Sequence, residues 1–222
     1  MLYLYYSSAG EAQLRLEGDE HRYIFKVRRH KVDDTINLRN LKDGLLHQYR
    51  ITMLDKRSAH LVLQESITHE VKAHRSLHIG WCIIDPKSVE KMLPTLNEIG
   101  VEKITFFYCK RSQKSFKLDF KRLEKILLNS SQQSGRSVMM QLDLKEDLKA
   151  FTEENPDAKM LNFSQNNFVS NIPLETIVIG CEGGFDAEEV ALFKTEDIFG
   201  FETPLVLKSE SAVTAVASKV LL

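Results

Sequence analysis

The chain has 222 residues, of which 43% are hydrophobic and 27% are charged, and this composition is ordinary for a folded globular protein. No apolar stretch approaches the roughly 20 residues of a membrane-spanning helix, and the first residues lack the basic and apolar regions of a signal peptide. The three cysteines form no CxxC pair, which excludes a disulfide framework and an all-cysteine zinc site and favours the reducing cytosol.

The net charge of -1 conceals an uneven charge distribution along the chain. Residues 103–136 contain nine basic and two acidic residues, whereas residues 141–202 contain four basic and fourteen acidic residues. We therefore expect a polyanionic partner to contact the first two thirds of the chain. Charged surfaces that meet only solvent would give the same pattern, so both interpretations stay open.

The first part of the chain consists of short segments typical of strands, separated by turn signals such as Lys42-Asp43-Gly44. Residues 21–29 fit either a helix or a strand. Residues 1–70 are therefore predicted to form a small β-barrel-like domain, and the polar segment 65–75 marks the domain boundary. The predicted strands here are residues 3–6, 35–39, 45–53 and 59–63.

From residue 73 to residue 222 the pattern changes to alternating strands and helices, which predicts an α/β domain with a mainly parallel sheet. One helix has clear ends, because Asp85 is a good N-cap, Pro86 suits the first helical position and Gly100 suits the end. The predicted strands are residues 76–84, 101–109, 138–144, 159–163, 176–181 and 204–207. The predicted helices are residues 86–100, 119–134, 186–193 and 211–222.

A glycine-bearing loop links the apolar strand 176–181 to a helix whose Asp186 and Glu189 suggest a capping box. Its residues 177–186 read IVIGCEGGFD. Such a loop lets a ligand approach bare backbone, and ligands of open α/β sheets bind at the carboxyl ends of strands. The loop matches neither GxGxxG nor a P-loop, so neither a dinucleotide nor a nucleoside triphosphate is indicated. A tight turn without a ligand remains the alternative.

The C-terminal segment 205–212, which reads LVLKSESA, precedes an unusually apolar helix. Ser209 or Ser211 is expected to cap this helix. Lys219 is the only charged residue in 211–222, and a helix that is apolar on most sides is buried. This predicts either deep docking in the domain or a subunit interface, and we favour the interface.

Two basic segments are candidates for RNA contact. Lys117, Lys121 and Lys125 recur at a spacing of four and suit phosphate contacts, although a solvated helix face has the same pattern. A second cluster interleaves Tyr23 and Phe25 with cations, as RNA binding favours, although an edge strand protected by charge also fits. The basic residues of this second cluster are Arg22, Lys26, Arg28, Arg29, His30 and Lys31.

All seven histidines lie in the first 78 residues, far in sequence from the glycine loop. No Ser/His/Asp grouping and no HExxH motif is present, so neither triad chemistry nor a metal site is expected. Cys181 is expected to be a small buried residue rather than a nucleophile.

These motifs, in this order, resemble those of the RsmE family of small-subunit (16S) ribosomal RNA uridine-N3 methyltransferases, in the SPOUT superfamily. IGCEGGFDAEE at 179–189 resembles the family's glycine loop, VLKSESA at 206–212 its C-terminal loop, and QQSGR at 132–136 its E-Q-x-x-R element. TLNEIGV at 95–101 resembles K-A-T-E-L-G-V, and the N-terminal matches at His21, 26–28 and 33–36 are looser. The chain departs from the family pattern at Thr95, Gln132, Cys181, Lys208 and Ser211.

The resemblance implies a PUA-like β-barrel followed by a methyltransferase domain whose C-terminal segment forms a trefoil knot. It also implies S-adenosylmethionine as cofactor, small-subunit ribosomal RNA as partner, no metal, and a homodimer formed through the knot and the C-terminal helix. The implied RNA-binding residues are Arg22, Arg28, Arg29, Lys31, Lys117, Lys121 and Arg136. The implied cofactor-binding residues are Phe163, Ile179, Gly180, Glu182, Gly183, Gly184, Leu205, Leu207, Lys208, Ser209 and Ala212.

In the implied reaction, N3 of a uridine attacks the sulfonium methyl group after losing its proton. Our hypothesis is that Arg136 contacts the uridine or its phosphate and favours the deprotonated base electrostatically. One alternative is an RNA-binding protein of the same fold that has lost methyl transfer, which the departures at Thr95, Gln132 and Lys208 would allow. Another alternative is a methyltransferase of the same class that acts on a different RNA. An α/β oxidoreductase is the third, although the missing GxGxxG motif disfavours it.

Overall fold

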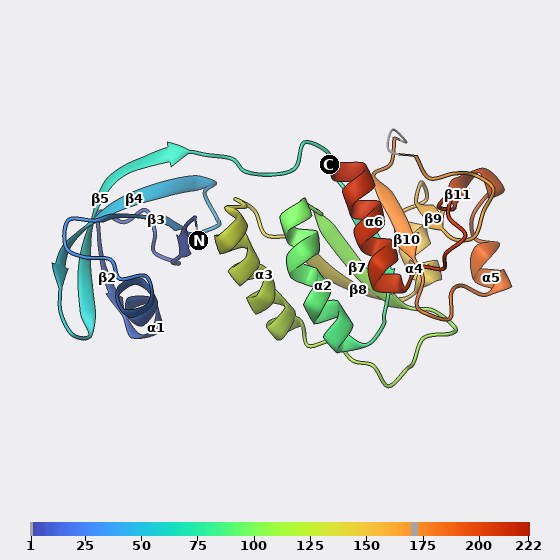
Figure 1. The fold of residues 1–222 in the computed structure, drawn as a ribbon, viewed down its shortest axis with the longest axis horizontal. Helices are drawn as coiled ribbons and strands as arrows, with labels where there is room; N and C mark the ends of the chain where they lie inside the picture. Colours follow the sequence, from blue (N-terminus) through green and yellow to red (C-terminus); the bar gives the residue numbers. More distant parts are fainter. Residues whose placement is uncertain (1, 170–172) are drawn as a thin grey trace. The chain divides into compact units, whose positions relative to one another are not determined.

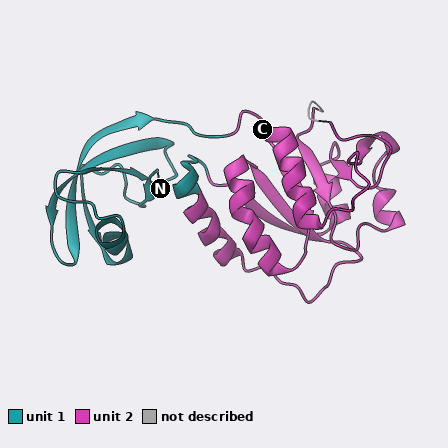
Figure 2. Cartoon of the chain, in the orientation of Figure 1, with its two compact units in different colours: residues 1–72, 131–138 teal, residues 73–130, 139–222 magenta. Residues whose placement is uncertain are grey.

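The computed structural model describes residues 2–169 and 173–222, and the chain divides into two compact units (Figure 2). The first unit contains residues 1–72 and 131–138, and the second contains residues 73–130 and 139–222. The sequence placed residues 131–138 in the second domain, whereas in the structure they pack with the first unit. None of the described helices is long and apolar enough to cross a membrane.

The first unit is built on a five-stranded sheet with the order β1-β3-β4-β5-β2. Its pairs are antiparallel, apart from the parallel pair of β1 and β3. The predicted strands are all present, but β5 extends to Thr68, so the polar segment 65–75 begins inside a strand. The strands are β1 Leu4–Tyr5, β2 Gln13–Glu17, β3 Thr35–Arg39, β4 Leu45–Leu54 and β5 Ser58–Thr68.

Residues 21–29, which fit either a helix or a strand in sequence, are helical as far as Val27. Helix α1 (Gly18–His21) continues directly as a π-helical turn, η1 (Arg22–Val27). Ile24 is buried in the core of the first unit, while the side chains of Arg22 and Arg28 stay exposed. The helical conformation therefore buries Ile24, packs Tyr23 and Phe25 partly against the core, and leaves the cations at the surface.

The second unit contains a six-stranded sheet with the order β11-β9-β10-β6-β7-β8, and all its pairs are parallel, as predicted (Figure 1). The strands are β6 His78–Cys82, β7 Lys103–Tyr108, β8 Gln141–Asp147, β9 Lys159–Leu161, β10 Thr176–Ile179 and β11 Ile198–Phe199. The helices are α2 Pro86–Ile99, α3 Phe120–Ser134, α4 Leu148–Glu154, α5 Ala187–Val190 and α6 Ser209–Leu221, with a 3-10 turn η2 at Thr195–Asp197. The last four residues of α3, 131–134, belong to the first unit.

Two predicted strands of this unit need correction. The strand predicted at 204–207 is wrong: these residues form no strand, and Leu205 and Val206 are exposed. Pro204 has no N–H to donate to a sheet, and the edge position is taken by β11 instead. The strand predicted at 138–144 begins only at Gln141, and α4, which follows it, was not predicted at all.

The helix ends explain where the elements begin. The Asp85 carboxylate accepts a hydrogen bond from the N–H of Ser88 at 3.1 Å, and Gly100 ends α2 with a φ of +112°. The predicted capping box of Asp186 and Glu189 is present at the start of α5. The predicted serine cap of α6 is wrong, because Lys208 is its N-cap residue and makes no side-chain cap bond.

Helices cover both faces of the parallel sheet. Side chains alternate between the two faces of a strand, so Gly80 and Trp81 of β6 face opposite sides. Phe151 of α4 lies over Gly80, whereas Trp81 bonds to Ser209 of α6 on the other side. Helices α2 and α6 lie side by side on that second side (Figure 1). The predicted burial of α6 is confirmed at Ser209, Ala212, Val213, Val216, Ala217 and Val220.

Candidate functional site

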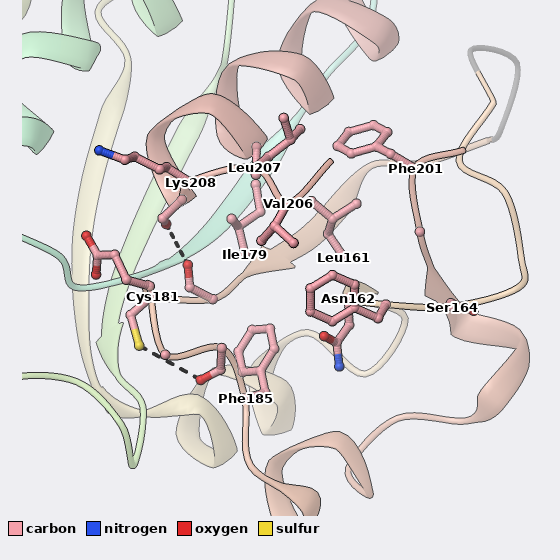
Figure 3. A pocket seen from close by; sticks show the side chains of 18 of the residues that line it. Leu161, Asn162, Ser164, Ile179, Cys181, Phe185, Phe201, Val206, Leu207 and Lys208 are labelled. Carbon is pink, nitrogen blue, oxygen red and sulfur yellow. Dashed lines mark hydrogen bonds between the residues drawn. The ribbon is translucent and has the colours of Figure 1, made fainter. Parts of the chain in front are cut away.

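A cavity of about 910 Å³ opens beside the carboxyl ends of β9 and β10 in the second unit (Figure 3). Three chain segments supply most of its lining: residues 161–165, 179–185 and 200–209. All eleven residues that the sequence marked as cofactor-binding line this one cavity, although they span positions 163 to 212. They are Phe163, Ile179, Gly180, Glu182, Gly183, Gly184, Leu205, Leu207, Lys208, Ser209 and Ala212.

The glycine loop forms one wall of the cavity. It turns tightly, since the N–H of Gly184 donates to the Cys181 carbonyl at 2.9 Å and Gly184 has a φ of +66°. A φ in this range suits glycine because it has no Cβ. Phe185 packs against Gly180 and is buried, so the turn is supported from behind by an aromatic ring.

Residues that follow β7 hold the glycine loop in place. The N–H of Lys110 donates to Glu189 at 2.8 Å, and its ammonium pairs with Asp186 at 3.0 Å. The Arg111 guanidinium donates to the Gly183 carbonyl at 2.8 Å. The backbone N–H of Glu189 and the Lys110 ammonium hold the pKa of Asp186 below its usual range. These contacts anchor the glycine loop to the segment that follows β7.

The three cysteines are free thiols that gather behind this wall. Cys82 and the backbone N–H of Cys109 both bond to the Ser112 hydroxyl, at 3.0 Å each. Burial raises the pKa of Cys82 to about 12, and a bond with Cys82 together with burial raises the pKa of Cys181. Such thiols stay protonated at neutral pH, so the predicted burial of Cys181 is confirmed and nothing favours a nucleophile.

The opposite wall is far more exposed. Leu205 and Val206 are 72% and 75% exposed, and Phe163 at the rim is 83% exposed. Lys208 is exposed as well, and the wall becomes buried only at Ser209. Exposed apolar side chains gathered at one place indicate a surface that another molecule covers.

Sequence patterns missed several lining residues, namely Arg111, Asn162, Ser164, Gln165 and Phe201. Arg111 follows β7, and residues 162–165 follow β9. Because ligands of open α/β sheets bind just beyond the carboxyl ends of strands, the position after each predicted strand was the signal that could have identified them.

The other predicted site residues lie outside the cavity lining. Lys117 donates to the Tyr108 hydroxyl at 3.3 Å, and Lys121 is exposed on α3. Arg136 belongs to the first unit, where its Nε donates to the Val138 carbonyl at 2.7 Å and its own carbonyl accepts from the Tyr3 hydroxyl at 2.8 Å. Burial raises the pKa of Tyr3 to about 12.

The basic cluster of the first unit lies at its surface. Arg22, Arg28, Arg29 and Lys31 are all exposed. The Arg28 guanidinium donates twice to the Tyr23 hydroxyl, at 2.8 and 3.1 Å, and lies 5.4 Å from the ring centroid. This pairing places a cation beside a half-buried aromatic ring, a combination that suits an unstacked base. Among the described residues no group of three metal-ligating side chains comes together.

Two family models match the chain. The model described as an RNA methyltransferase domain matches residues 71–221, and the one described as an RNA methyltransferase PUA domain matches residues 16–64. These ranges follow the division between the β-rich segment and the α/β segment.

Curated relatives carry a more specific description. Ribosomal RNA small subunit methyltransferase E of Helicobacter pylori is 37% identical over 222 residues, covering 98% of each chain. The protein of the same name from Mesomycoplasma hyopneumoniae is 31% identical over 155 residues, covering 64% of this chain and 67% of its own length.

Solved structures share the fold at lower identity. A ribosomal RNA small subunit methyltransferase E from Neisseria gonorrhoeae, bound to S-adenosylmethionine, has a TM-score of 0.79 at 19% identity and covers 98% of this chain and 95% of its own. A methyltransferase from Legionella pneumophila in complex with S-adenosylmethionine also has a TM-score of 0.79, at 21% identity, and covers 98% of this chain and 96% of its own.

Proposed function

We propose that this chain transfers a methyl group from S-adenosylmethionine to N3 of a uridine in small-subunit ribosomal RNA. The proposal starts from the family to which the chain belongs, the ribosomal RNA small subunit methyltransferases E. One observation carries the proposal: the eleven cofactor-binding residues that the family resemblance implies all line a single cavity. The β-rich domain that matches the PUA model is the proposed RNA-holding part.

The cavity residues fit the proposed cofactor. The volume of the cavity, about 910 Å³, lies within the roughly 300–1,000 Å³ of small-molecule sites. Gly183 and Gly184 expose backbone, while Ile179 and Leu207 offer apolar contacts for an adenine ring. The charged lining residues, Arg111, Glu182 and Lys208, include both signs, as a ligand with an ammonium and a carboxylate requires. When bound, the cofactor supplies a methyl group on a positively charged sulfur.

The residues of this chain must make uridine N3 a nucleophile and place it. N3 carries a proton at neutral pH, so the reaction needs the proton removed or the resulting anion stabilised. We assign anion stabilisation to Arg136, whose guanidinium is always charged. The bond from its Nε to Val138 fixes the orientation of the side chain. Glu182 is assigned to the organisation of the loop rather than to proton removal.

RNA contact is assigned to exposed cations. Arg22, Arg28, Arg29 and Lys31 are exposed in the first unit, where Arg28 lies beside the Tyr23 ring, and Lys117 and Lys121 belong to the second unit. Phosphate contacts release counterions, so each contributes about 0.7–0.9 to the slope of log affinity against log salt. Neutralising Arg28 and Arg29 together should lower that slope by about one to two.

The apolar rim of the cavity supports a homodimer. Phe163, Leu205 and Val206 are exposed around the opening, and a second copy of the chain is the proposed cover. The trefoil knot implied by the family resemblance belongs to the same proposal. The three free thiols support action in a reducing compartment such as the cytosol. Light scattering should show a dimer, and a monomer at working concentration would contradict this part.

The deciding experiment is methyl transfer. Small ribosomal subunits from cells lacking the protein are incubated with the purified chain and labelled S-adenosylmethionine, and nucleosides are identified by mass spectrometry. We expect 3-methyluridine, and we expect Arg136→Ala to reduce its rate at least a hundredfold. Methylation at another nucleotide would contradict the uridine-N3 assignment. Retention of subunits without transfer would favour the binding-protein alternative.

A further inference from the structure

A buried chain of two hydrogen bonds links the sheet core to both walls of the cavity. The indole N–H of Trp81, in β6, donates to the Ser209 hydroxyl at 2.9 Å. That hydroxyl donates to the Gly180 carbonyl at 2.5 Å. Ser209 is 128 residues from Trp81 and 29 residues from Gly180 in sequence. The fold alone brings these three groups together.

The direction of each hydrogen bond follows from the chemistry of the groups. An indole N–H only donates and a carbonyl only accepts. The Ser209 hydroxyl must therefore accept from Trp81 and direct its single proton to Gly180. That proton is not available to a ligand, so the side chain of Ser209 has a second role beside the cofactor contact that the family resemblance implies.

Burial makes these bonds consequential. Trp81 is fully buried and Ser209 is 5% exposed. Water cannot readily replace a lost partner there, and a buried donor left without an acceptor is costly. The Trp81 ring also stacks on Phe106, with centroids 6.0 Å apart, and its strand position pairs with Ile179 of β10. The indole is thus fixed by the core and provides a rigid anchor.

The two groups that Ser209 joins belong to opposite walls. Gly180 begins the glycine loop, and Ser209 directly follows the exposed segment 205–208 as the first residue of α6. The glycine loop has further support from Lys110 and Arg111. For the exposed wall, Ser209 is the first buried point after Leu205, so its bond to Gly180 sets the spacing between the walls.

We infer that Ser209 is a positioning residue that holds the two walls of the cofactor cavity at the separation S-adenosylmethionine requires, and that Trp81 orients it. The inference rests on the proposed function and deepens it. We call the two hydrogen bonds that join Trp81, Ser209 and Gly180 the relay. The inference assigns the only tryptophan of the chain to this relay, which ends in the cavity wall. Because that tryptophan is unique, its fluorescence reports on the relay without any label.

The first test measures cofactor binding by calorimetry with the full chain. Ser209→Ala should weaken S-adenosylmethionine binding about tenfold, which corresponds to about 1.4 kcal/mol. The KM for the cofactor should rise in parallel, while kcat at saturating cofactor should change less than threefold. Ser209→Thr, which keeps a hydroxyl, should restore most of the affinity. Ser218→Ala, in the same helix but outside the cavity lining, is the matched control.

The second test uses Trp81 fluorescence. Addition of S-adenosylmethionine to the wild type should change the intensity or the emission maximum, because Ser209 is hydrogen-bonded to both the indole and the cavity wall. In Ser209→Ala the emission maximum should already be shifted without cofactor, and the cofactor response should shrink. Trp81→Phe keeps an aromatic ring but removes the N–H donor. It should weaken binding about threefold by calorimetry, and it tests the relay independently if Ser209→Ala does not fold.

The outcomes separate the inference from the proposed function. Wild type that does not bind S-adenosylmethionine would overturn the proposed function and the inference with it. Wild type that binds, with equal affinity in Ser209→Ala and Trp81→Phe, would overturn the inference alone. Weaker binding that Ser209→Thr does not restore would also overturn it, since the hydroxyl would then not be the active group.

Discussion

The two ends of the parallel sheet are built from different chemistry. At the carboxyl ends, glycine backbone and exposed apolar side chains line the cavity of about 910 Å³. At the amino ends, charged and aromatic side chains contact one another, as in the pair of Lys159 and Asp197 at 2.6 Å. A second cavity of about 870 Å³ lies there, lined by residues 74–76, 154–159 and 173–176, with no glycine among them.

The difference indicates a division of roles within one sheet. Open α/β sheets bind ligands at the carboxyl ends of strands, where loops can change without disturbing the core. Side chains that pack around the amino ends contribute to stability instead. Substitutions at the two ends should therefore separate cleanly, with stability changing at one end and cofactor binding at the other.

A pair of phenylalanines gives the largest expected contrast. Phe151 is fully buried and contacts His78 and Phe107 with ring centroids 5.3 and 5.5 Å away, whereas Phe163 at the cavity rim is 83% exposed. Phe151→Ala should lower the free energy of unfolding by about 3–5 kcal/mol in urea titrations. Phe163→Ala should leave that free energy within about 0.5 kcal/mol and weaken cofactor binding instead. Equal losses of stability would contradict the division.

Gly184 offers a smaller effect confined to the cavity end. Its φ is +66° and a Cβ would meet no atom within 4 Å, so Gly184→Ala introduces backbone strain without a clash. The strain is about 1–2 kcal/mol. A variant loop that relaxes this strain in the free protein must regain the turn when the ligand binds, which predicts roughly tenfold weaker S-adenosylmethionine binding in calorimetry. Gly184→Asn is the matched control, because asparagine adopts this conformation more readily and should lose less affinity. Identical affinities in Ala and Asn variants would argue against backbone strain as the cause.

His78, at the amino end of β6, predicts that the stability of the protein depends on pH. Burial lowers the pKa of His78 from 6.5 to about 4. Between these values the unfolded chain binds a proton that the folded chain does not, so stability should fall as the pH decreases from about 6.5 to about 4. His78→Gln should flatten this part of the stability profile in urea titrations at several pH values. A wild-type profile that is flat over the window would contradict the assignment.

Local sequence patterns were sufficient for the elements that depend on neighbouring residues. Buried strands, the Asp85 cap and the capping box at Asp186 are all determined within a few positions, and each is present. The strand predicted at 204–207 failed because an apolar run alone does not show whether a neighbouring strand is available. Helix α4 was missed because it is only seven residues long.

Contacts between distant parts of the chain could not be read in this way. Residues 131–138 join the first unit through bonds such as that from the N–H of Leu2 to the Gln132 carbonyl at 2.8 Å. Ser209 fits a helix cap in sequence, yet its hydroxyl is used by Trp81 and Gly180. In both cases the decisive partner lies more than twenty residues away, where no spacing rule applies.

Lys103→Gln should produce the smallest effect and sharpen the assignment of His78. Lys103 pairs with Asp143 at 3.5 Å, and both side chains are about a third exposed, so losing the pair should cost less than about 1 kcal/mol. The Lys103 charge is also one cause, after burial, of the lowered pKa of His78. Its removal should raise the pKa of His78, as followed by NMR titration of the imidazole. The pH range over which the stability falls should therefore become narrower. Arg122→Gln removes another surface pair, with Glu90, and should leave the His78 pKa unchanged. If both variants moved the pKa equally, the effect would reflect net charge rather than the environment at the amino ends of the strands.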